Sequence, residues 1–120
     1  MPNIIFFEVP ANDVDRAKGF YSDIFDWRIN RIPERDCWEI DTNDTIGLTS
    51  GGMLKRMHPE QRITNYIDVS SVDKYSARVL ELGGKVILSK KAVPAMGYFA
   101  ICQDTEGNAF ILWECDDLAR

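Results

Sequence analysis

Two carboxylates are the side chains best suited to chemistry in this sequence. Glu8 and Asp68 occupy equivalent positions in two similar segments, NIIFFEV and ITNYIDV, which start 60 residues apart. Because side chains alternate across a strand, both carboxylates are expected on the inward, concave side of a sheet. There they would bind a ligand or, if the pKa of one is raised, act as an acid/base pair. The alternative is that both lie near solvent at strand ends, or pair with Arg28, Arg31 or Lys85.

Apolar side chains with polar tips are the expected lining of such a cleft. Small-molecule sites usually combine aromatic surface with a few polar groups. The candidates for ligand binding are Phe6, Trp38, Tyr66, Tyr98, Cys102 and Trp113. Packing in the core or in a dimer interface is the competing interpretation of these residues. Cys102 has no nearby histidine to activate it, so we interpret it as a small apolar side chain rather than a nucleophile.

The sequence offers few ligands for a metal ion. Its one histidine, His58, stands beside Pro59 and is expected on a solvated loop, so a site with two histidines cannot form within one chain. A carboxylate site from Glu8, Asp68 and Glu39 would suit Mg²⁺ or Mn²⁺ rather than zinc. The sequence contains no phosphate-binding or dinucleotide glycine motif.

The elements that must position these residues occur twice. In the first half, residues 3–9 form a strand ended by Pro10, Asn12 and Asp13 cap a helix that ends near Phe25, and three strands follow at 27–32, 37–41 and 45–49. The apolar face of this helix is expected to contain Val14, Ala17, Phe20, Tyr21, Ile24 and Phe25. Residues 51–62 contain two glycines, a proline and scattered charge, which is typical of a linker or loop.

The second half repeats the plan. A strand at 63–69 precedes a helix with the apolar face Val72, Tyr75, Val79 and Leu80, which the glycines at 83 and 84 end. Strands follow at 85–88, 97–103 and 108–114, and residues 104–107 form a hairpin turn in which Gly107 has a positive φ. The sequence therefore predicts an α+β fold of two tandem βαβββ modules that form a curved mixed sheet with helices on its convex side.

The predicted modules make one domain. Module 1 covers about residues 1–50, the linker 51–62 and module 2 about 63–120, and a chain of 120 residues favours a single domain. The net charge of −5 makes nucleic acid an unlikely partner, because phosphate backbones are repelled. Three cysteines without a CxxC pair indicate reduced thiols. The sequence predicts neither a signal peptide nor a membrane span, and a cytoplasmic location is expected.

Two stretches carry a family resemblance over essentially the whole chain. The first comprises FEVPAND at 7–13, RA at 16–17, FY at 20–21 and FDW at 25–27, and the second is PAMGYFAICQDTEGNAFILWE at 94–114. They resemble the vicinal-oxygen-chelate superfamily of glyoxalases, bleomycin-resistance proteins and dioxygenases, in the branch of predicted enzymes related to lactoylglutathione lyase. The resemblance implies the paired-module fold and a homodimer.

In metal-using members of that superfamily, inward His or Glu side chains hold a divalent ion that binds two neighbouring oxygens of the substrate. The resemblance puts these ligand positions at Ile4, Thr64 and Ile111 of this chain. Isoleucine has no lone pair to offer and a lone threonine hydroxyl is a poor ligand, so the usual metal and the activity that depends on it are not expected.

The expected function is therefore binding of a small organic ligand in the concave cleft, without a metal cofactor. Sequestration like that of bleomycin-resistance proteins, or a sensor role, would fit. The alternatives are a lyase, isomerase or dioxygenase with a displaced metal site, a metal-free acid/base enzyme that uses Glu8 and Asp68, or a module whose concave face serves mainly to dimerise.

Overall fold

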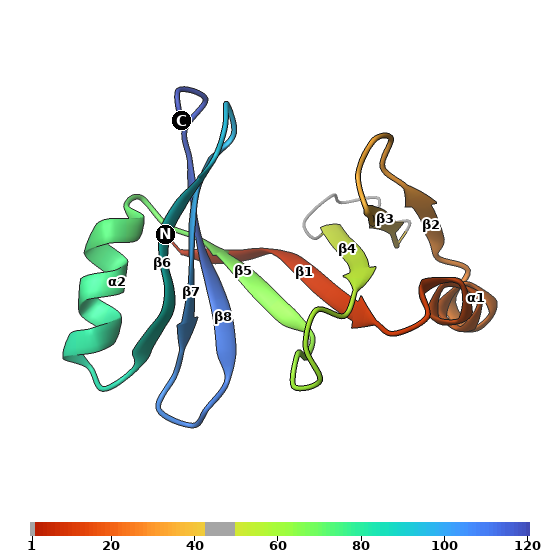
Figure 1. The fold of residues 1–120 in the computed structure, drawn as a ribbon, viewed down its shortest axis with the longest axis horizontal. Coiled ribbons are helices and arrows are strands. Elements are labelled where there is room, and N and C mark those ends of the chain that lie inside the picture. Colours follow the sequence, from red (N-terminus) through yellow and green to blue (C-terminus); the bar gives the residue numbers. More distant parts are fainter. Residues whose placement is uncertain (1, 43–49) are drawn as a thin grey trace. The chain divides into compact units, whose positions relative to one another are not determined.

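The computed structural model describes residues 2–42 and 50–120, and it confirms the predicted duplication. The chain divides into two compact units. The N-terminal unit is Ile5–Thr64, and the C-terminal unit is Asn65–Arg120 together with the start of the chain through Ile4. The order of elements is β1-α1-β2-β3-β4 and then β5-α2-β6-β7-β8, which is one βαβββ set after the other (Figure 1). The α+β class is therefore confirmed.

The N-terminal unit contains a mixed sheet. Its strands are β1 (Asn3–Ala11), β2 (Arg28–Arg31), β3 (Cys37–Asp41) and β4 (Ser50–Lys55). They lie in the order β2-β3-β4-β1, with β1 and β4 parallel and the other pairs antiparallel. The parallel pair is the feature that a crossover through a helix produces.

Two predictions for this unit are wrong, and a third lies outside the described residues. Pro10 does not end β1, because the strand continues to Ala11 with Pro10 opposite Leu54 of β4. Gly51 and Gly52 do not begin a linker but lie within β4. Gly51 fits there because the ring of Phe7, its partner in β1, occupies the space that a Cβ would need. The predicted strand at 45–49 falls outside the described residues.

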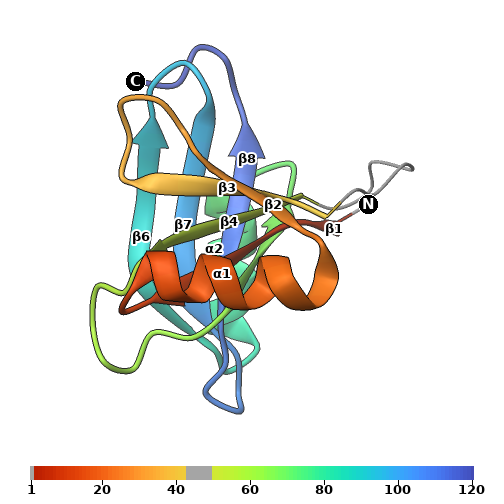
Figure 2. The same cartoon turned by 90° about the vertical axis from the view of Figure 1, so that its right-hand side faces the viewer.

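Helix α1 (Val14–Phe25) begins and ends as its sequence predicts. The Asp13 side chain accepts a hydrogen bond from the Arg16 amide at 3.0 Å, and Asp26 ends the helix with a φ of 58°. Figure 2 shows α1 alongside the strands of this unit. Three of its side chains, Val14, Ala17 and Tyr21, pack against the core formed by Val9, Ala11, Ile29, Ile40 and Met53.

The other half of the predicted apolar face of α1 stays exposed. Phe20 is 59% exposed, and Ile24 and Phe25 are each 53% exposed. Tyr21 stacks on Trp27 with their ring centroids 5.6 Å apart. The ring centroid of Phe25 lies 5.0 Å from that of the same indole. The end of the helix is thus fixed by aromatic contacts at one side of the unit rather than by deep burial.

The C-terminal unit has the same arrangement. Its strands are β5 (Thr64–Asp68), β6 (Lys85–Val93), β7 (Gly97–Gln103) and β8 (Ala109–Cys115), in the order β5-β8-β7-β6. Strands β5 and β8 are parallel, and the two other pairs are antiparallel. Strand β6 is longer than the predicted 85–88, and its pairing with β7 shifts register twice, between Val86 and Leu88 and between Leu88 and Lys91.

Helix α2 (Val72–Glu81) lies against β6, β7 and β8 (Figure 1). The hydroxyl of Ser71 caps it by accepting from the Lys74 amide at 3.2 Å. The core beneath it consists of Val69, Val72, Ala100, Cys102 and Leu112, against which Tyr75 and Val79 pack as predicted. Gly107 has a φ of 85° in the predicted hairpin turn. No helix in the described ranges is long and apolar enough to cross a membrane.

Candidate functional site

The sheet face opposite α2 gathers the candidate binding residues of the C-terminal unit. Leu112 of β8 and Ala100 of β7 lie side by side on the helix face. Because side chains alternate along a strand, the residues immediately before and after each of them point to the opposite face. We call this other side the open face. Its residues, given by the strand register, are Tyr66, Asp68, Leu88, Lys91, Phe99, Ile101, Ile111 and Trp113.

The register arranges the open face in two rows across the four strands. One row is largely aliphatic, with Tyr66 beside Ile111, Ile101 and Leu88. Ile111 is only 5% exposed, so this row is well packed. The other row, which we call the charged row, contains Asp68, Trp113, Phe99 and Lys91 in that order. It has a carboxylate at one end, an ammonium group at the other and two aromatic side chains between them.

Gly97 and Cys115 fix the position of the Trp113 indole. The ring lies over Gly97, where a Cβ atom would come within 2.8 Å of its Cζ2. Its Nε1 donates a hydrogen bond to Sγ of Cys115, 3.2 Å away. Only a residue without a side chain leaves room for the indole to lie on the sheet in this way. Trp113 is therefore a fixed aromatic surface on the open face.

The N-terminal sheet places Glu8 and Phe6 on its own face opposite α1. Phe7 and Val9 belong to the core on the helix side, so the alternate residues of β1 point away from it, as predicted. The row across the strands is Glu8, Gly52, Glu39 and Asn30. Gly52 has no side chain, and the end of the Phe6 ring lies over it, 2.7 Å from where its Cβ atom would be. Glu8 is half-buried and makes contacts of its own.

Three of the predicted ligand-binding residues lie on the helix side instead. Trp38 packs against the core with Ile40, because the two share one face of β3. Tyr98 and Cys102 pack beneath α2 with Val72. Their expected positions on the concave face were wrong, whereas Phe6, Tyr66 and Trp113 do lie opposite the helices. Burial raises the pKa of the Cys102 thiol, which agrees with its interpretation as an apolar side chain.

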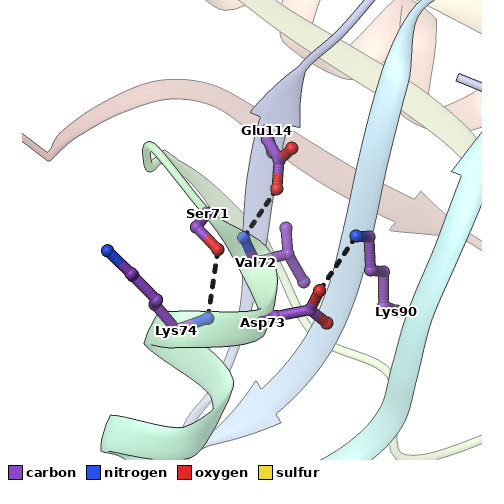
Figure 3. A network of polar contacts seen from close by, with 6 residues as sticks. All are labelled: Ser71, Val72, Asp73, Lys74, Lys90 and Glu114. Atoms are coloured by element: carbon purple, nitrogen blue, oxygen red, sulfur yellow. Dashed lines mark hydrogen bonds and ion pairs between the residues drawn. The ribbon is translucent and has the colours of Figure 1, made fainter. Parts of the chain in front are cut away.

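A polar network at the start of α2 was not predicted from the sequence (Figure 3). Oε1 of Glu114 accepts a hydrogen bond from the Val72 amide at 2.8 Å, and Asp73 Oδ2 lies 3.0 Å from Lys90 Nζ. The ammonium of Lys90 also lies 4.3 Å from the centroid of the Tyr98 ring. The hydrogen bond to Asp73 raises the pKa of Lys90 above its ordinary value.

The residues at the family's ligand positions do not fit a divalent metal ion. Thr64 donates its hydroxyl to the Arg62 carbonyl at 3.0 Å, and Ile4 and Ile111 offer no ligand atom. His58 is exposed in the segment that follows β4. Within residues 2–42 and 50–120, no three His, Cys, Asp or Glu side chains come together as a metal site would require.

Comparison with known proteins shows consistent likenesses. The family model described as "Bleomycin resistance protein-like N-terminal" matches residues 3–43. A "Glyoxylase-like domain-containing protein" of Didymella fabae is 32% identical over 111 residues, which is 84% of this chain and 84% of that protein.

Two solved structures agree with the fold at low sequence identity. A glyoxalase/bleomycin resistance protein/dioxygenase superfamily member from Vibrio splendidus 12B01 has a TM-score of 0.70 and 14% identity, covering 97% of this chain and 100% of that chain. Methylmalonyl-CoA epimerase from Mycobacterium tuberculosis has a TM-score of 0.58 and 12% identity, covering 96% and 87%. At these identities the likeness concerns the fold alone.

Proposed function

Because this chain belongs to the glyoxalase and bleomycin-resistance group of the vicinal-oxygen-chelate superfamily, we propose that it binds a small organic ligand on the open face without a catalytic metal. One observation carries the proposal. Three partly exposed apolar side chains, those of Phe99, Ile101 and Trp113, share the sheet face that α2 does not cover, next to the polar groups of Tyr66 and Asp68. Apolar surface with a few polar groups is the usual composition of a small-molecule site.

The donor atoms support binding without a metal. The positions that would ligate an ion contain Ile4, Thr64 and Ile111, which supply at most one weak ligand among them. Binding would therefore depend on apolar contact and hydrogen bonds. Sequestration or sensing of the ligand requires nothing more than this.

A thermal-shift screen of metabolites, run with and without EDTA, tests the proposal. Ligands that raise the Tm by the same amount in both conditions, with no metal found by elemental analysis, are the expected result. Ile101→Ser should weaken their binding, because it removes apolar surface from the open face. Leu80→Ser is the matched control, since Leu80 is an aliphatic residue of α2 that is 59% exposed. Loss of every shift in EDTA would contradict the metal-free proposal.

A metal-free acid/base enzyme is the second candidate, and the N-terminal unit favours it by one observation. Glu8 and Glu39 flank Gly52 in the strand register, so two carboxylates share one sheet face, with the end of the Phe6 ring over the glycine between them. Such a pair is able to pass a proton to and from a ligand. Glu8→Gln and Glu39→Gln separate the candidates. Loss of turnover with unchanged ligand affinity supports an enzyme, whereas loss of affinity with no turnover in the unmodified protein supports a binding protein.

We further propose that the protein acts as a homodimer in the cytoplasm. The family resemblance supports the dimer, and three cysteines without a CxxC pair support a reducing compartment. Sedimentation equilibrium should give twice the chain mass, and a monomer at micromolar concentration would contradict the dimer. Cell fractionation tests the location.

A further inference from the structure

Two adjacent lysines of β6 have different surroundings. Lys90 lies on the helix side, where it pairs with Asp73 and contacts the ring of Tyr98. Lys91 is opposite Phe99 in the strand register, which puts it on the open face, and its side chain is exposed. Within the described part of the chain, Lys91 and Asp68 each lack an ion-pair partner. The charge of Lys90 is thus paired with a carboxylate of its own unit, whereas that of Lys91 is not.

The irregular pairing of β6 puts Lys91 in this position. Between Leu88 and Lys91 the strand advances three residues, while its partner β7 advances two, from Ile101 to Phe99. Such a bulge inserts a residue and re-aims the side chains that follow. A regular strand would direct Leu88 and Lys90 to the same face. Because of the bulge, Lys90 reaches α2 and Lys91 takes the last place of the charged row.

The charged row has the dimensions of an elongated small molecule. Asp68 and Lys91 are separated by three strand spacings, which places their Cα atoms about 14 Å apart. Aspartate and lysine side chains are long enough to extend over the sheet from either end, so a ligand about 8–10 Å long would bridge them. Between the charges lie Phe99 and Trp113, whose rings offer flat apolar surface.

We propose that the charged row selects a planar, conjugated ligand with a carboxylate at one end and an amine at the other. The ligand's carboxylate pairs with Lys91, its amine pairs with Asp68, and its planar body lies on Phe99 and Trp113. The proposal rests on the proposed function and names the ligand class for the same face. Charge complementarity supports this occupant, because opposite unpaired charges at the two ends fit a ligand of opposite polarity.

Polarity also gives the ligand a single direction on the sheet. A reversed ligand would bring its carboxylate against Asp68 and its amine against Lys91, and like charges in contact are disfavoured. A purely anionic aromatic compound would gain the contact with Lys91 but meet a chain with a net charge of −5. The amine end is therefore what distinguishes the proposed ligand from a simple aromatic acid.

Calorimetric titration with three probes tests the inference on the full chain. The probes are (E)-4-(aminomethyl)cinnamate, which has both ends, cinnamate, which has only the acid, and 4-methylbenzylamine, which has only the amine. The two-ended probe should bind tightest. Asp68→Asn should weaken it about tenfold without changing the affinity for cinnamate, because a neutral amide keeps the shape but not the charge. Lys91→Met should weaken both acids by a similar factor.

Lys90→Met is the matched control, since it removes the neighbouring lysine from the other side of the same strand. It should lower the Tm through loss of the Asp73 contact while leaving the affinity for all three probes unchanged. Circular dichroism confirms that each variant is folded. Equal affinity for the two-ended probe in the unmodified protein, Asp68→Asn and Lys91→Met would overturn the inference.

The same titrations separate this inference from the proposed function. If the metabolite screen yields ligands but none of the three probes binds, the ligand class is wrong and the binding function stands. If neither the screen nor the probes give a ligand, both fail.

Discussion

Replacement of Glu114 by leucine is expected to destabilise the C-terminal unit by about 2 kcal/mol. The Glu114 carboxylate accepts the amide N–H of Val72 at 2.8 Å. Val72 is the first residue of α2 and is completely buried, so no water can replace the lost acceptor without a rearrangement. The first amides of a helix have no partner within it, and a side chain from β8 satisfies this one.

The magnitude follows from two contributions. A buried N–H without an acceptor costs about 1–3 kcal/mol, and a negative charge at a helix N-terminus contributes about 0.3–1 kcal/mol. Leucine removes both, whereas Glu114→Gln keeps an acceptor oxygen and is expected to cost about 0.5–1 kcal/mol. At roughly 4 °C per kcal/mol, Glu114→Leu corresponds to a fall in Tm of about 8 °C.

Urea denaturation followed by far-ultraviolet circular dichroism gives the free energy of unfolding for each variant. Glu81→Leu is the control, because Glu81 also belongs to this unit but forms an exposed ion pair with Arg78 at 2.9 Å. Exposed pairs contribute little, so the control should differ from the unmodified protein by less than about 1 kcal/mol. Equal losses in Glu114→Leu and Glu81→Leu would refute the role assigned to the capping bond.

Three further substitutions test the fold. Gly19→Ala should stabilise the protein by about 0.5–1 kcal/mol in urea denaturation, because Gly19 is inside α1 and its Cβ would meet nothing within 4 Å. Gly97→Ala should destabilise it by about 1–3 kcal/mol, because the new Cβ would collide with the carbonyl of Glu114 as well as with the indole of Trp113, and unchanged stability would contradict this packing. Hydrogen bonds from the Asn108 amide and side chain, and from the Glu106 amide, lower the pKa of Asp104. Its folded pKa is thus below its unfolded value, so the stability lost in Asp104→Ala should be greatest at neutral pH and should shrink below about pH 4, as measured by urea denaturation across pH.

The fold could be predicted from the sequence because its signals are local. Asp13 and Ser71 cap the two helices as expected, and the apolar phase of β1 places Phe7 and Val9 on the helix side. Strands 37–41 and 97–103 have the predicted bounds. Each of these features depends on residues within one turn or one strand, where propensity and alternation are informative.

The misplaced residues depend on pairing between strands. In β7 both faces are apolar, with Tyr98 and Cys102 on one side and Phe99 and Ile101 on the other. Alternation alone does not show which of the two sets faces α2. The pairing of Ala100 with Leu112, both in the core beneath α2, puts Tyr98 and Cys102 on the helix side. Trp38 was within reach of sequence reasoning, since it alternates with Glu39 and shares the face of Ile40. The position of Lys91 could not be predicted from the sequence, because no residue type in β6 indicates the bulge between Leu88 and Lys91.

The two units share one arrangement of strands and helix, but the side chains on the sheet face opposite the helix differ between them. On the face away from its helix, each sheet has an aromatic ring over a glycine, Phe6 over Gly52 and Trp113 over Gly97. Each also carries a carboxylate from its first strand.

The row that continues from Glu8 is polar and acidic, ending in Glu39 and Asn30. The row that continues from Asp68 is aromatic and ends in a lysine. Apolar surface supplies binding free energy and opposite charges supply direction, so the C-terminal row has the composition of a ligand floor. The acidic row has the Phe6 ring but no opposite charge, and its carboxylates are better suited to proton transfer than to fixing the direction of a ligand.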